Sequence, residues 1–203
     1  MSTTILLVRH ADVHNPGRLF YGRLPRFRLS DLGRRQASFL ADYLKDVPIV
    51  AFYTSPMLRA RQTARILASR HPGVPLHRAT PLIEVRTGWM GRVETDIPPV
   101  INLYEPRHSP TDETIQDVWH RVDAFIRRLV RRHHGQIVCL VSHGDPVVVA
   151  HAGYLGLPLT LGSIRGSFYP QKCSVTTLAF DGNVSVAYRD VIGELAPELR
   201  APH

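Results

Sequence analysis

Two short segments of the sequence place a histidine directly after an apolar run. Arg9-His10 follows Ile5–Val8, and Ser142-His143-Gly144 follows Ile137–Val141. A neutral imidazole can act as a nucleophile or as a hydrogen-bonding group, and a guanidinium grips phosphate oxygens through paired N–H groups. Histidines and arginines in these positions are therefore suited to the transfer of a phosphoryl group.

A third candidate segment lies between these two. Another apolar run ends in Thr54-Ser55-Pro56, and Arg59 and Arg61 fall in the first turns of the helix expected after it. Short continuous apolar runs are typical of strands buried on both faces of a parallel sheet, and ligands bind beyond the carboxyl ends of such strands. We expect the imidazoles and guanidiniums to meet at one rim of the sheet. The alternative is that each histidine only hydrogen-bonds the end of a helix. That alternative explains less well why two histidines occur at equivalent strand ends beside arginines.

The remaining pattern supplies the elements that would position these residues. Apolar residues recur at helical spacing after Ser30, which can cap a helix, and most clearly over about 112–134. The sequence predicts a three-layer α/β/α sandwich with a mostly parallel central sheet. The expected helices are 30–46, 56–69, 112–134 and 145–155, and the expected strands are 5–8, 49–54, 136–142, 173–180 and 184–188.

Length and composition favour one globular domain over 1–203. Hydrophobic residues make up 44% of the 203 residues, charged residues 21%, and cysteines number two, so no disulfide framework is expected. Within the domain, about 74–134 is expected to form an irregular and helical excursion over the site. About 194–203 is expected to be a loosely ordered tail.

The charge pattern narrows the choice of partners. The net charge is +8, but the basic residues are nearly all arginines and are scattered along the chain. This favours an anionic small molecule over nucleic acid. No apolar run approaches the length of a membrane span, and the four apolar residues before Arg9 are too few for a signal peptide. We therefore expect a cytoplasmic protein with no membrane or nucleic-acid partner, and leave a homodimer open.

Four motifs together resemble the histidine phosphatase superfamily, which has the phosphoglycerate-mutase-like fold. They are Arg9-His10, the stretch from Ser55 to Ala64, Leu82-Ile83-Glu84 followed by Gly88-Trp89-Met90-Gly91, and Ser142-His143-Gly144. They occur in the family's order and span most of the chain. A single Arg-His pair would be weak evidence, whereas four motifs at compatible spacing are specific.

The resemblance implies a role for each matching residue. His10 would be the nucleophile, Arg9 and Arg59 would bind the phosphoryl oxygens, and His143 would add a donor together with the backbone around Gly144. Glu84 would donate and then recover a proton. Neither a metal nor a cofactor is expected. The predicted substrate-binding residues are Asn15, Tyr21, Gly22, Arg23 and Gly144.

The sequence also departs from the family pattern. The usual Arg-His-Gly-Glu is Arg9-His10-Ala11-Asp12 here, and Asp12 is a rival to Glu84 as proton donor. Asp145 is a further rival, although at the start of its helix it also suits the helix dipole. Asn15 stands one residue closer to the histidine than is common, and it could instead be a turn residue.

The predicted function is that of a phosphomonoesterase acting on a small phosphorylated metabolite through a phosphohistidine on His10. The span between Glu84 and His143 is shorter than in the mutases of the family, so a smaller lid would leave the intermediate open to water. The arginines near the site, including Arg23 and Arg86, suggest a second anionic group on the substrate. The alternatives are mutase-type phosphoryl transfer and a non-catalytic phosphate-binding module.

Overall fold

The computed structural model describes residues 2–96, 102–105, 107–166 and 168–200. These residues form a six-stranded sheet with the strand order β3-β2-β4-β1-β5-β6. The pairs β1–β4, β2–β4 and β2–β3 are parallel. β5 pairs antiparallel with both of its neighbours, β1 and β6. The predicted mostly parallel sheet is confirmed. The strands are β1 (Thr3–Arg9), β2 (Ile49–Thr54), β3 (Leu76–Arg78), β4 (Ile137–Ser142), β5 (Val175–Asp181) and β6 (Asn183–Arg189).

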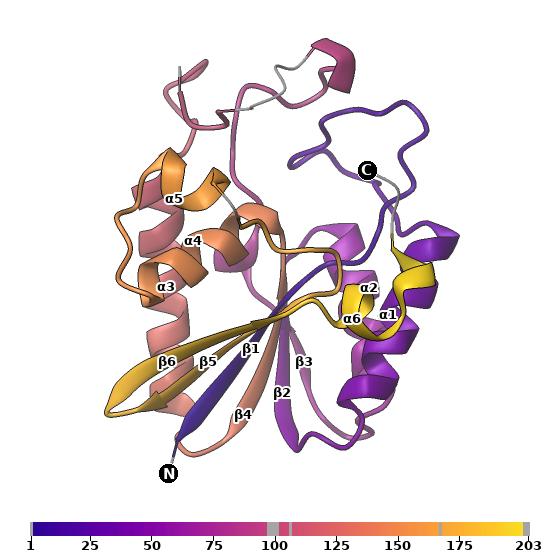
Figure 1. Ribbon diagram of the computed structural model, residues 1–203, viewed down its shortest axis with the longest axis vertical. Coiled ribbons are helices and arrows are strands. Elements are labelled where there is room, and N and C mark those ends of the chain that lie inside the picture. Colours follow the sequence, from indigo (N-terminus) through magenta and orange to yellow (C-terminus); the bar gives the residue numbers. More distant parts are fainter. Residues whose placement is uncertain (1, 97–101, 106, 167, 201–203) are drawn as a thin grey trace.

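Helices cover both faces of this sheet (Figure 1). One face carries α1 (Asp31–Leu44), α2 (Leu58–Ala68) and α6 (Val191–Leu195). The other carries α3 (Ile115–Arg132), α4 (Gly144–Tyr154) and α5 (Leu161–Arg165). Short 3-10 turns occupy Thr80–Leu82, Glu94–Asp96 and Pro197–Leu199. The three-layer sandwich is thus the architecture that the alternation of apolar runs and amphipathic segments predicts.

Two apolar cores lie on opposite faces of the sheet, and the central strand β1 serves both. Ile5 and Leu7 belong to the core under α3 and α4, and Leu6 and Val8 belong to the core under α1 and α2. Successive side chains of a strand point to opposite faces, so an uninterrupted apolar run fits a strand covered on both sides.

Several element boundaries differ from the sequence-based expectation for local reasons. Ser30 does cap α1, its side chain accepting from the Gly33 amide. The next helix begins at Leu58 with Met57 as its N-cap, so Pro56 lies outside its first turn. The long helix begins at Ile115, because Thr114 and Asp117 form a capping box. β3 and α5 span three and five residues, too few to show a period.

Two larger expectations need correction. The span 74–134 does not lie over the site as a whole, because Leu76–Arg78 pairs with β2 and α3 packs into the core against the sheet. Residues 194–200 are not a loose tail: they complete α6 and a 3-10 turn, and Ala196 is buried. Residues 97–101, 106 and 201–203 of these spans lie outside the described residues.

The sheet register brings the predicted segments to one rim. Arg9 pairs with Ser142, and Thr54 pairs with Val141, so β1, β2 and β4 end level with one another. The Ser142 hydroxyl donates to the Leu82 carbonyl at 2.7 Å, which anchors the segment leading to Glu84 beside β4. In the described part of the chain, no helix combines the length and the apolar character needed to cross a membrane.

Candidate active site

His10 stands immediately beyond the end of β1, with its ring orientation set by the backbone. Its amide donates to the Ser142 carbonyl at 2.9 Å, and its Nδ1 lies 2.7 Å from the Ala11 carbonyl. A carbonyl only accepts hydrogen bonds, so Nδ1 carries the proton and Nε2 keeps its lone pair. Burial, followed by the positive charges of Arg59 and Lys172, holds the pKa of His10 well below 6.5. The ring is therefore neutral at neutral pH, as a nucleophile must be.

Arg59 of α2 faces this free lone pair. Its Nε donates to His10 Nε2 at 3.1 Å, and its Nη2 donates to the Gly22 carbonyl at 2.7 Å. The side chain is fully buried, and Nη1 has no hydrogen-bond partner among the described residues. The Tyr21 ring covers the guanidinium, with its centroid 4.6 Å from Cζ. This arrangement keeps a fixed positive charge beside the nucleophile.

Arg9 supplies a second guanidinium at the rim. Its Nη1 donates to the Pro170 carbonyl at 2.6 Å, and its Cζ lies 5.0 Å from the centre of the Tyr169 ring. Arg9 lines the same cleft as His10. The two arginines predicted to bind phosphate are thus both at the site, Arg59 directly against the nucleophile and Arg9 anchored to the loop before β5.

His143 lies across from His10, with the two ring centroids 5.1 Å apart. Its Nε2 is 2.7 Å from the Ser55 hydroxyl, which also accepts from the Met57 amide. Its Nδ1 is 4.0 Å from Oε2 of Glu84 and forms no hydrogen bond within the described residues. Burial is the main cause, and Arg59 the next, of a pKa well below 6.5. His143 is therefore also a neutral group, held by the segment after β2.

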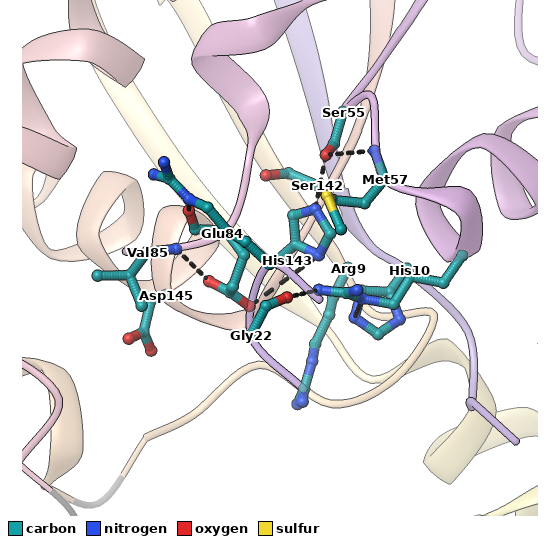
Figure 2. Close-up of polar contacts among 12 residues, drawn as sticks. Arg9, His10, Gly22, Ser55, Met57, Glu84, Val85, Ser142, His143 and Asp145 are labelled. Atoms are coloured by element: carbon teal, nitrogen blue, oxygen red, sulfur yellow. Dashed lines mark hydrogen bonds and ion pairs between the residues drawn. The ribbon is translucent and has the colours of Figure 1, made fainter. Parts of the chain in front are cut away.

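Glu84 brings a carboxyl group to the same point. Its Oε1 accepts from the Val85 amide at 2.9 Å, and Figure 2 shows the carboxyl group turned toward His143. Burial raises the pKa of Glu84, and the nearby charge of Asp145 raises it further. A carboxyl group whose pKa is raised keeps its proton to higher pH, which suits a general acid.

Among the predicted substrate-binding residues, Tyr21 and Gly22 lie next to the nucleophile. The Tyr21 ring is 6.5 Å from that of His10, and the carbonyl of Gly22 binds Arg59. Gly144 opens α4, and a Cβ there would stand 2.0 Å from the Tyr169 hydroxyl, so any larger residue would force the Tyr169 side chain to move. These three residues shape the walls of the site.

Asn15 and Arg23 behave differently from the prediction. Asn15 lines the cleft, but both ends of its amide bind the backbone of Leu19, which is the turn role that the sequence also allowed. The cleft contact expected of Arg23 is not seen. Its Nε donates to the backbone carbonyl of Glu84 at 2.6 Å, and its Nη2 binds Glu113 at 2.6 Å. Arg23 therefore helps to position the backbone of Glu84.

The rival proton donors are both engaged elsewhere. Asp12 accepts from the Ser30 hydroxyl at 2.6 Å at the start of α1. Asp145 is buried and accepts from Arg165 at 2.5 Å and from the hydroxyls of Tyr169 and Tyr104. Both line the cleft, but neither carboxylate shares the position of Glu84 beside His143.

A cleft of about 930 Å³ lies at the site and is lined by Arg9, His10, Tyr21, Gly22 and Glu84, among others. It extends past residues that the sequence did not single out, among them Arg165, Tyr169 and Lys172. They come from the stretch between α4 and β5, where no short motif marks them. Among the described residues, no group of three or more histidine, cysteine or acidic side chains is arranged to hold a metal ion.

The site thus combines two facing histidines of lowered pKa, two arginines and a carboxyl group of raised pKa. A family model described as histidine phosphatase superfamily (branch 1) matches residues 5–189. The chain belongs to the histidine phosphatase superfamily. This histidine phosphatase is 34% identical over 195 residues to an uncharacterised protein of Mycobacterium tuberculosis, covering 92% of this chain and 95% of that one.

Relatives with a named activity are phosphatases. The chain is 29% identical over 166 residues to phosphoserine phosphatase 1 of Hydrogenobacter thermophilus, covering 77% of this chain and 78% of that one. Its fold superposes on Bacillus stearothermophilus YhfR with a TM-score of 0.79 and 28% identity, covering 91% and 95% of the two chains. The predicted family, fold and phosphatase activity are confirmed at this level.

Proposed function

We propose that this histidine phosphatase hydrolyses a small phosphate monoester through a phosphohistidine on His10. The observation that carries the proposal is the state of His10, whose proton is held on Nδ1 by Ala11 while the lone pair of Nε2 faces Arg59. A buried, neutral imidazole with a free lone pair beside a fixed cation is prepared to attack an electrophilic phosphorus.

In the first step, Nε2 of His10 attacks phosphorus, and the bond from phosphorus to the leaving oxygen breaks. Arg59 now donates to the His10 lone pair, so the incoming phosphoryl oxygens would take over these donors as the new bond forms. Arg9 and His143 would complete the ring of donors around the developing charge. Glu84 would give its proton to the leaving oxygen, which departs as an alcohol.

In the second step, water attacks the phosphohistidine. The Glu84 carboxylate takes a proton from this water, the bond from phosphorus to nitrogen breaks, and inorganic phosphate leaves. Glu84 and His10 return to their starting states, so no proton or electron is left over. Glu84 is suited to both directions because its carboxyl group is held by Val85 on one oxygen and faces His143 with the other.

The test is a covalent label on the nucleophile. After mixing with a radiolabelled monoester and rapid quenching, the enzyme should carry a phosphoryl group that is stable to base and labile to acid. His10→Ala should lose both the label and the turnover, whereas His77→Ala on β3, an exposed histidine, should keep both. Full turnover by His10→Ala, or a label resistant to acid, would refute the mechanism.

Mutase-type transfer is the second candidate, and the packing of α3 favours hydrolysis over it. α3 makes up much of the span between Glu84 and His143, yet its apolar residues are buried against the sheet rather than placed over the cleft. Less chain is therefore left to exclude water from a phosphohistidine. Phosphate release should exceed transfer between the positions of a phosphoglycerate, and the reverse result would favour a mutase. A cytoplasmic location, independence of metal and cofactor, and a homodimer stay predictions.

A further inference from the structure

Lys172 is a cation of the cleft that the proposed mechanism does not use. It lies in the segment before β5, is partly buried, and lines the cleft together with His10. Its Nζ donates to the Tyr21 hydroxyl at 3.4 Å, which is a long hydrogen bond. In the described part of the chain, its ammonium group forms no ion pair.

Two other basic side chains that line the cleft have their charge matched by a carboxylate. Arg165 binds Asp145 at 2.5 Å, and Arg200 binds Asp190 at 3.3 Å. Arg23, which the sequence suggested for a second anionic group, does not line the cleft, and its charge is matched by Glu113. Lys172 has no such partner, so its charge is available to a ligand.

Lys172 contacts Tyr21, the residue whose ring also covers Arg59. The face of the Tyr21 ring lies on Arg59, and its hydroxyl group points to Lys172. Tyr21 thus contacts both cations, the guanidinium through its ring face and the ammonium group through its hydroxyl. The charge of Lys172 still lowers the pKa of His10, which places it within electrostatic range of the reacting atoms.

Charge balance decides what Lys172 would bind. A phosphate monoester brings about two negative charges at neutral pH, and the guanidiniums of Arg9 and Arg59 supply two positive ones. A third positive charge in a partly desolvated cleft favours a ligand with a further negative charge. Building on the proposed function, we propose that Lys172 is a specificity-determining residue that binds a second anionic group, a carboxylate or another phosphate, on the leaving-group side of the substrate.

The test compares matched substrates that differ in that group. 3-Phosphoglycerate and glycerol 3-phosphate differ by a carboxylate, and fructose 1,6-bisphosphate and fructose 6-phosphate differ by a phosphate. The wild-type enzyme should prefer the more anionic member of at least one pair, measured as kcat/KM for phosphate release. Lys172→Met should reduce that preference by about tenfold or more, the contribution of a hydrogen bond to a charged group. The pair affected identifies the group that is bound.

Two further variants control for folding and for charge in general. Because the preference is a ratio measured on one protein sample, partial unfolding cancels. Lys172→Arg should restore most of the preference, and Arg200→Gln, which removes a cleft cation already matched by Asp190, should leave it unchanged. An equal loss for both members of each pair would mean that Lys172 contacts only the transferred phosphoryl group, and it would overturn the inference. A wild-type enzyme with no preference would also overturn it, whereas failure to hydrolyse any monoester would refute the proposed function instead.

Discussion

At the scale of single residues, the site sets two buried imidazoles of lowered pKa beside a carboxyl group whose pKa is raised. His10 and His143 are buried beside Arg59, which disfavours a further positive charge on either ring. Glu84 is buried near Asp145, which disfavours a further negative charge. Burial and neighbouring charges therefore shift the pKa values in opposite directions, and each shift stabilises the form that the first chemical step requires.

Replacing Glu84 tests its role as proton donor. Glu84→Gln should lower kcat/KM for an alkyl phosphate by about 100-fold or more, because an alkoxide needs a proton as it leaves. An aryl phosphate, whose leaving group is stable as an anion, should lose much less. Asp12→Asn is the matched control, since Asp12 is engaged with Ser30. If the Asp12 variant instead showed the loss that depends on the leaving group, the two assignments would have to be exchanged.

The pH dependence of kcat/KM should follow from the same shifts. His10 must be neutral, and because its pKa is depressed, the acidic limb should lie below the ordinary value of 6.5. Glu84 must be protonated, and because its pKa is raised, the basic limb should lie above the ordinary value of 4.5. Rates measured across the acidic and neutral range for the wild type should be bell-shaped. Glu84→Gln should flatten the basic limb, and an unchanged limb would assign that titration to another group.

The residues of the site that lie in short motifs could be predicted from the sequence. His10, Arg59, Glu84 and His143 follow or flank strand ends, and the sheet register brings them together. The direction in which the Arg23 side chain points, toward Glu113 and away from the cleft, was not predictable. Glu113 is far from Arg23 in the sequence and lies just before α3. Lys172 was missed for the same reason: a contact between two loops leaves no period or spacing in the sequence.

At the scale of elements, the helices were predictable where an amphipathic pattern ran for several turns. α1 and α3 have both a cap and a continuous apolar stripe, so their existence follows from the sequence and their first residue from the cap. α4 is buried along nearly its whole length and follows a strand directly, so its start depends on the turn at His143. The short β3 and α5 are stabilised mainly by contacts with neighbouring elements. Such contacts cannot be predicted from a hydrophobic pattern within three or five residues.

The crossing of α3 and α4 depends on a residue without a side chain. A Cβ at Gly153 of α4 would stand 2.3 Å from the Trp119 ring of α3, closer than carbon atoms can approach. Gly153→Ala should therefore lower the free energy of unfolding by about 1–3 kcal/mol, the usual cost of overpacking. Urea denaturation would measure this change.

A matched glycine provides the control for that substitution. At Gly162 of α5, a Cβ would have its nearest neighbour at 3.8 Å, an ordinary contact. Gly162→Ala should be neutral or slightly stabilising, because alanine is the better helix former. Adding Trp119→Leu to Gly153→Ala should recover part of the loss. A Gly153→Ala protein as stable as the wild type would show that the two helices can separate without cost.

At the scale of the whole molecule, the site joins four distant segments of the chain, so its electrostatics are also part of the folding equilibrium. His10 follows β1, Arg59 lies in α2, Glu84 follows the 3-10 turn Thr80–Leu82, and His143 is the N-cap of α4. In the unfolded chain these segments separate, and each histidine regains its ordinary pKa of 6.5. The groups that prepare the enzyme for catalysis therefore make its stability depend on pH.

The sign of that dependence follows from the number of protons bound. Below pH 6.5 the unfolded chain protonates His10 and His143 while the folded chain does not, so acidification favours unfolding. Glu84 acts in the opposite direction, because above pH 4.5 the folded chain retains a proton that the unfolded chain releases. Two protons outweigh one, so the net contribution of these three groups is a loss of stability as the pH falls below 6.5.

Urea titrations at a series of pH values would measure this contribution. Each buried histidine should steepen the fall in the free energy of unfolding by about 1.4 kcal/mol per pH unit below the unfolded pKa. His143→Gln keeps a side chain able to hydrogen-bond Ser55 but cannot bind the proton, so it should make the fall shallower. His77→Ala, which removes an exposed histidine, should leave the slope unchanged. A His143→Gln slope equal to that of the wild type would show that His143 is protonated in the folded enzyme. A wild-type stability that stays constant on acidification would contradict the lowered pKa of both rings and would remove the basis for a neutral nucleophile.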